Sequence, residues 1–110
     1  MGSDYAVLED GVQIMAGAII QAGARIGANS IINTGAIVDH DGHLGSDNHV
    51  APGAVLSGGV VTGERVHIGT GAAVIQNIKI GSHTVVGDGA SDVKDLANNQ
   101  VLYVAKSFLR

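Results

Sequence analysis

The chain has no cysteine, little charge and few aromatic residues. Among its 110 residues there is one Pro and no Trp, and only 15% are charged. Without Cys there is neither a disulfide framework nor a thiol nucleophile. No apolar run reaches the roughly 18 residues that span a bilayer, and no secretory signal is recognisable. We therefore expect a soluble, cytoplasmic protein with no membrane partner.

Charge is also unevenly distributed along the chain. The formal net charge is −4, with one basic and six acidic residues in residues 1–60 and five basic and four acidic residues in residues 61–110. Nucleic-acid-binding domains usually show a basic patch or stripe. Because no such patch is present, we expect no nucleic-acid partner.

What the chain does have is an aliphatic residue at every sixth position. Thirteen of the fourteen residues that begin a hexad are Leu, Ile or Val. They are Leu8, Ile14, Ile20, Ile26, Ile32, Val38, Leu44, Val50, Leu56, Ile68, Val74, Ile80 and Val86, with Thr62 as the exception. A period of six fits neither a helix nor a long strand. Short repeats that each bury one face predict a solenoid.

The fourth position of each hexad indicates a bend. Twelve of these fourteen residues are Gly, Asn or Asp, which tolerate a positive φ. Pro52 and Gly53 form the pair that a type II turn favours. The fifth position is mostly small or β-branched, and the three aromatic residues lie outside residues 8–91, which fits a narrow interior.

This repeat resembles the hexapeptide-repeat left-handed β-helix family, in which three hexads form one triangular coil. The resemblance implies an all-β fold, a single-stranded left-handed parallel β-helix of about 4.7 coils with no extruded loop. We expect a single domain over residues 1–110, with the hexads in residues 8–91 and a short C-terminal tail in residues 92–110.

Polar side chains concentrate in residues 39–49, which hold three His and three Asp. With eighteen residues in a coil, His40 lies beside Gly58 one coil on, at the strand spacing of about 4.8 Å. An imidazole would then face backbone without a side chain, which leaves space and an exposed N–H. Imidazole suits general base catalysis at neutral pH. The same register places His49 beside His67, and Asp47 beside Arg65 as an expected ion pair.

Residues 32–81 are similar to the acyltransferase domain of the sialic-acid O-acetyltransferase and UDP-amino-sugar N-acetyltransferase family. The resemblance rests on the Asp-His-Asp element around His40, on His49 and on the APGA…LSG run. It implies transfer of an acetyl group from acetyl-CoA to a hydroxyl or amine of a sugar or nucleotide sugar. It also implies a homotrimer with three sites between neighbouring subunits, and no metal.

The resemblance also implies a role for each matched position. The general base matches His40, and Asp41 matches the acid that raises its basicity. The positions that match coenzyme contacts are His49, Gly58, Thr70 and Asp88, with Gly58 offering its N–H to the thioester carbonyl and the last two along the pantetheine path.

Several of these residues also have a purely structural interpretation. Asp41 occupies a bend position and could serve only the turn, and His49 could simply pack against His67. His43, His67 and His83 are better explained as surface or interface residues.

Two other function classes occur among proteins with this kind of repeat. A zinc-dependent carbonic anhydrase of the β-helix type would need a pair of His residues five positions apart, which this chain lacks. A catalytically inactive trimeric scaffold is the main alternative. It is supported by the start of the chain almost at the first hexad, without the N-terminal sugar-binding domain that the family usually carries. A second departure from the acetyltransferase pattern is that the last ten residues, VLYVAKSFLR, lack the usual Gly-Asn-Pro near the adenine end of the coenzyme site.

Overall fold

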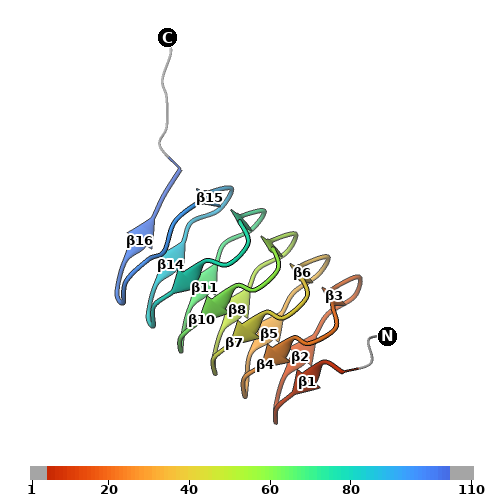
Figure 1. Cartoon of the computed structure of the whole chain (residues 1–110). Helices are drawn as coiled ribbons and strands as arrows, with labels where there is room; N and C mark the ends of the chain where they lie inside the picture. Colours follow the sequence, from red (N-terminus) through yellow and green to blue (C-terminus); the bar gives the residue numbers. More distant parts are fainter. Residues whose placement is uncertain (1–4, 105–110) are drawn as a thin grey trace.

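Two-residue strands wind the chain into a β-solenoid, seen from the side in Figure 1. The structure is a computed structural model that describes residues 5–104. The sixteen strands of this part form three parallel sheets. Within residues 5–104 there is no helix that could cross a membrane.

Each of the first five coils contributes one strand to each sheet, and the last coil contributes one strand to sheet B. Sheet A contains β1 (Val7–Leu8), β4 (Arg25–Ile26), β7 (His43–Leu44), β10 (Val61–Thr62) and β13 (Lys79–Ile80). Sheet B contains β2 (Gln13–Ile14), β5 (Ile31–Ile32), β8 (His49–Val50), β11 (His67–Ile68), β14 (Val85–Val86) and β16 (Val101–Leu102). Sheet C contains β3 (Ile19–Ile20), β6 (Ile37–Val38), β9 (Val55–Leu56), β12 (Ala73–Val74) and β15 (Ser91–Asp92).

Stacked strands pair with a register of eighteen residues. His49 pairs with His67 in sheet B, and Ile37 pairs with Val55 in sheet C. The residue that begins each hexad points inward, and Ile26 and Val86, for example, are fully buried. The predicted parallel β-helix and its eighteen-residue coil are therefore confirmed.

The bends follow the fourth position of the hexad without exception from Gly11 to Gly89. All fourteen of these residues have a positive φ, including Arg65 at 56° and His83 at 59°. Residue type alone did not predict these two. The repeat imposes the bend on them, because each corner backbone is held by hydrogen bonds to the corners of adjacent coils, such as His83 N–H to Glu64 O at 2.9 Å.

The interior also contains a polar group that replaces the usual small residue. The Asn48 amide is buried and donates to the carbonyl oxygens of Gly45, Ser46 and Gly63 at 2.8–3.2 Å. Its oxygen accepts a hydrogen bond from Thr62, the one residue without an aliphatic side chain in its inward column. The two exceptions to the repeat thus satisfy each other inside the solenoid.

The solenoid continues past the predicted end of the hexads. Ile80 pairs with Leu96, and Val85 pairs with Val101, so the last coil takes sixteen residues instead of eighteen. Within the expected tail, Asp92, Leu96, Val101 and Leu102 pair with the coil before them. The remainder of the expected tail, residues 105–110, lies outside the described residues.

Candidate active site

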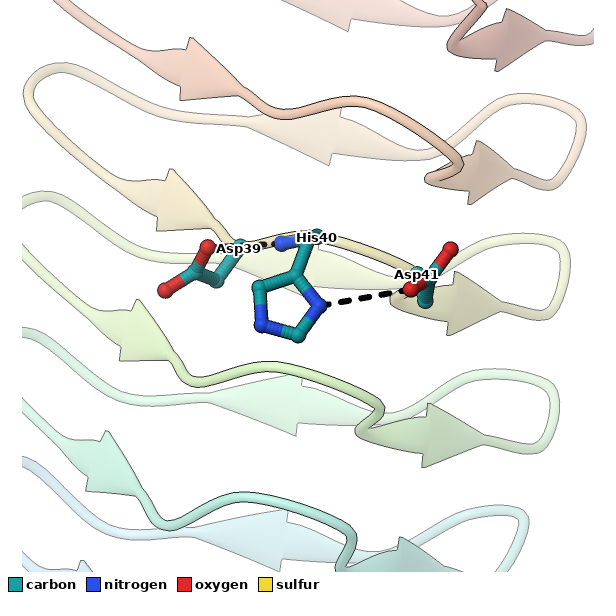
Figure 2. A network of polar contacts seen from close by, with 3 residues as sticks. All are labelled: Asp39, His40 and Asp41. Carbon is teal, nitrogen blue, oxygen red and sulfur yellow. Dashed lines mark hydrogen bonds and ion pairs between the residues drawn. The ribbon is translucent and has the colours of Figure 1, made fainter.

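His40 lies at the corner between sheets C and A, after β6 and before β7 (Figure 2). Its Nδ1 is 3.3 Å from Asp41 Oδ2, and its backbone N–H donates to Asp39 Oδ1 at 2.7 Å. An ionised carboxylate can only accept hydrogen bonds. Nδ1 therefore carries the proton in the neutral ring, and Nε2 keeps the lone pair that a general base needs.

The imidazole of His40 covers Gly58 of the next coil. A Cβ on Gly58 would overlap the ring, coming within 3.1 Å of Cδ2 and closer still to Cε1 and Nε2. Only a residue without a side chain allows the His40 ring to approach the backbone this closely. The predicted contact between His40 and Gly58 is therefore present.

The backbone N–H of Gly58 has no acceptor among residues 5–104, whereas several equivalent corner N–H groups are capped by side chains. Asp39 caps His40, and Asp88 caps Thr70. A free N–H therefore lies at the same corner as the Nε2 of His40, which pairs a base with a hydrogen-bond donor for developing negative charge.

Asp41 is both a turn residue and the partner of His40. Its φ is 59°, as the bend requires, and its carboxylate bonds the ring. The same carboxylate rests over Gly23 of the previous coil, where a Cβ would come within 3.2 Å of the Asp41 Cγ. The two interpretations of Asp41 are thus compatible.

His49 lies on the outer face of sheet B, in β8. Its ring packs edge-on against His67, with the ring centroids 4.9 Å apart. Its Nε2 is 3.3 Å from the side-chain nitrogen of Asn33. Burial lowers the pKa of His49, and the neighbouring His67 lowers it further. His49 is therefore a half-buried, neutral imidazole at neutral pH.

Thr70 and Asp88 stack at the corner between sheets B and C. The Thr70 N–H donates to Asp88 Oδ1 at 2.9 Å. Asp88 also borders a groove of about 400 Å³ along sheet B, which is lined by His67, Val85, Gly87, Asp88, Tyr103 and Val104. This groove continues the row of side chains that begins at His49.

The six predicted site residues thus form two groups on one chain. His40, Asp41 and Gly58 share the corner between sheets C and A, while His49, Thr70 and Asp88 lie on sheet B and its corner with sheet C. In a three-sided coil the corner between C and A is opposite sheet B. One subunit alone does not bring the two groups together.

Other predicted contacts are missing from the described part of the chain. Asp47 and Arg65 form no ion pair there, since both are exposed and an exposed pair gains little. His43 and His83 are exposed on other corners and strands. Residues 5–104 contain no cluster of three or more potential metal ligands.

Two residues at the site were not predicted, although the register could have revealed them. Gly23 precedes Asp41 by one coil of eighteen residues, just as His40 precedes Gly58. Asn33 follows Ile31, the strand partner of His49, by two positions and so faces the same side of sheet B.

Comparisons with known proteins agree with the observed fold. Residues 5–40 match the family model described as bacterial transferase hexapeptide (six repeats). Comparison with curated protein sequences finds no match.

Solved structures of acetyltransferases share the fold. A variant of perosamine N-acetyltransferase from Caulobacter crescentus, in complex with CoA and GDP-perosamine, is 40% identical with a TM-score of 0.80, over 92% of this chain and 51% of that one. The acetyltransferase domain of PglB from Neisseria gonorrhoeae is 36% identical with a TM-score of 0.80, over 92% and 52%. Maltose O-acetyltransferase from Clostridium difficile, at 20% identity and a TM-score of 0.80 over 90% and 64%, shares the fold alone.

This chain spans about half the length of the first two of these proteins. Over 92% of its own length it shares the β-helix fold of these two proteins, and residues 5–40 match the hexapeptide-repeat transferase family.

Proposed function

We propose that the chain transfers an acetyl group from acetyl-CoA to an amine or hydroxyl of a sugar or nucleotide sugar. The observation that carries this proposal is the position of His40, hydrogen-bonded to Asp41, against Gly58, whose backbone N–H has no acceptor among residues 5–104. The 40% identical neighbour is an N-acetyltransferase seen with CoA and GDP-perosamine, which supports a nucleotide-linked amino sugar as the first acceptor to test.

The corner residues supply the parts that acyl transfer needs. Acetyl-CoA, when bound, supplies the thioester whose acetyl group is transferred. His40 takes the proton from the attacking amine or hydroxyl at Nε2, and Asp41 orients the ring and stabilises its cation. The Gly58 N–H donates to the oxygen that becomes negative during attack. The carbon–sulfur bond of the thioester then breaks, and CoA leaves as the thiol with the proton that His40 returns. Direct transfer between the two substrates fits a chain without Cys.

The separation of the two groups of site residues supports an oligomer. In the proposed homotrimer, the corner of one subunit that carries His40 and Gly58 faces the sheet B surface of its neighbour, which carries His49, Thr70 and Asp88. Each of three sites then combines a base from one subunit with a coenzyme-binding surface from the next. No metal takes part in the proposed reaction.

Replacing the base tests the proposal. In His40→Asn we expect kcat to fall by about 10²- to 10⁴-fold, the usual contribution of a positioned general base. The assay measures release of CoA with acetyl-CoA and a panel of nucleotide-linked amino sugars and simple sugars. His43→Asn is the matched control, because His43 is exposed on β7 away from the corner, and it should retain full activity.

Two results would count against the proposal. Equal rates for His40→Asn and wild type would remove His40 from the mechanism. Calorimetry that shows no binding of acetyl-CoA or CoA to the wild-type chain would favour the trimeric scaffold instead.

A further inference from the structure

The side chain of Asn33 is fixed in one orientation on the outer face of sheet B. Its Oδ1 accepts the backbone N–H of Thr34 at 2.7 Å. A backbone N–H can only donate, so the oxygen of the amide must face Thr34, and the nitrogen must face the other way. That nitrogen, Nδ2, lies 3.3 Å from His49 Nε2.

This orientation decides which nitrogen of His49 carries the proton. The amide nitrogen of Asn33 is a donor and cannot accept, so His49 Nε2 has to be the acceptor of the pair. A neutral imidazole has one donor and one acceptor nitrogen, and the hydrogen bond made by one nitrogen sets the role of the other. Nδ1 of His49 therefore carries the proton and is available as a donor.

We infer that Asn33 is a positioning residue that holds His49 as the neutral Nδ1–H tautomer, so that His49 offers a hydrogen-bond donor to a ligand on sheet B. The imidazolium form is disfavoured at the same time, because its Nε2–H would point at the amide N–H of Asn33. Burial and the neighbouring His67 lower the pKa of His49, which acts in the same direction. The part of this inference that concerns acetyl-CoA as the ligand rests on the proposed function.

The tautomer is measured directly by long-range ¹H–¹⁵N correlation spectra of the histidine rings in the wild-type protein at pH 7.5. Comparison with His49→Gln assigns the His49 signals. We expect the wild-type spectrum to show Nδ1 protonated and Nε2 unprotonated. A wild-type His49 protonated at Nε2 would overturn the inference.

Variants of Asn33 test its part in this choice. Asn33→Ala removes the donor and should return His49 to the Nε2–H form that free imidazole prefers. Asn33→Asp replaces the donor with an acceptor and should place a proton on Nε2. Gln13→Ala changes another polar side chain on the outer face of sheet B, one coil before Ile31, and should leave the His49 spectrum unchanged. An unaltered tautomer in both Asn33 variants would show that Asn33 does not set it.

Binding of acetyl-CoA tests the consequence for function. Loss of one hydrogen bond corresponds to about 3- to 10-fold in affinity. We expect this weakening in Asn33→Ala by calorimetry, with unchanged affinity in Gln13→Ala. Equal affinity of Asn33→Ala and wild type would overturn the ligand role. If the wild-type chain does not bind acetyl-CoA, the proposed function and this ligand role fail together, while the spectra still decide the tautomer.

Discussion

At the scale of single residues, glycines one coil away from His40 and Asp41 shape the candidate site. Gly58 leaves room for the His40 ring, and Gly23 leaves room for the Asp41 carboxylate. Both glycines are one coil of eighteen residues away from the side chain that they accommodate. The stacking of the coils therefore determines where the side chains of His40 and Asp41 lie, and the two glycines leave space for them.

Gly23→Ala should reduce activity by displacing Asp41. The new Cβ would overlap the Asp41 carboxylate, so the carboxylate has to leave its place beside His40 Nδ1. We expect kcat/KM to fall by about 10- to 100-fold, a part of the roughly 10²- to 10⁴-fold that a general base provides. Steady-state kinetics of acetyl transfer measures this change.

Gly17→Ala separates that effect from backbone strain. Gly17 has nearly the same φ as Gly23, 74° against 77°, but a Cβ there meets nothing closer than 3.7 Å. Both variants should lose a similar stability of about 1–2 kcal/mol from the left-handed conformation. If Gly17→Ala lost as much activity as Gly23→Ala, the displacement of Asp41 would not be the cause.

At the scale of strands and coils, the repeat predicted most of the fold. Regular hexads were sufficient because every coil buries the same kind of residue at the same position. The repeat did not predict the sixteen-residue last coil, where the chain departs from the hexads. Likewise, the repeat did not predict the hydrogen bond between Asn48 and Thr62. Both residues differ from the usual residue of their hexad position, and only the folded solenoid brings them into contact.

The sequence predicted part of the candidate site, as it predicted most of the fold. The contact between His40 and Gly58 follows from register alone. The contact between Asn33 and His49 was not predicted, because it depends on the direction of side chains that are sixteen, not eighteen, residues apart.

Among the departures from the hexapeptide repeat, Asp92 in β15 has the clearest effect on stability. It takes the inward position that Val74 holds one coil earlier, and it is only 1% exposed. Its Oδ1 accepts the Lys94 N–H at 3.2 Å, while its Oδ2 has no partner among the described residues. Burial raises the pKa of Asp92, with a smaller contribution from Asp95 in the same direction, against the opposing effects of Lys94.

Asp92→Val should therefore stabilise the last coil. At pH 7 the gain in unfolding free energy should be about 1–3 kcal/mol, the usual cost of an unsatisfied buried polar group. Between the unfolded pKa of about 3.9 and the higher folded value, the native state binds more protons than the unfolded state, so wild-type stability falls as pH rises. The gain should accordingly shrink as pH falls toward 4.

Urea unfolding of both proteins between pH 4 and pH 8 measures this difference. Ser91→Ala serves as a comparison in the same strand, since it alters an exposed polar residue without touching the buried carboxylate. A gain that is the same at every pH, or a loss of stability in Asp92→Val, would contradict the account of Asp92.

On the scale of the whole molecule, the proposed site depends on how subunits meet. The solenoid sets His40 and the free N–H of Gly58 on one corner and the row of His49, His67 and the groove on the opposite side. A single subunit therefore holds two incomplete halves, and the proposed trimer is what joins them into three sites.

The most direct measurement is a crystal structure of the protein with acetyl-CoA or CoA. We predict a trimer in which the coenzyme lies along sheet B of one subunit and its sulfur end reaches His40 and Gly58 of the next. In the acetyl-CoA complex, the thioester oxygen should lie within about 2.7–3.2 Å of the Gly58 nitrogen. A coenzyme bound entirely to one subunit, or one whose sulfur end lies far from His40, would contradict the account.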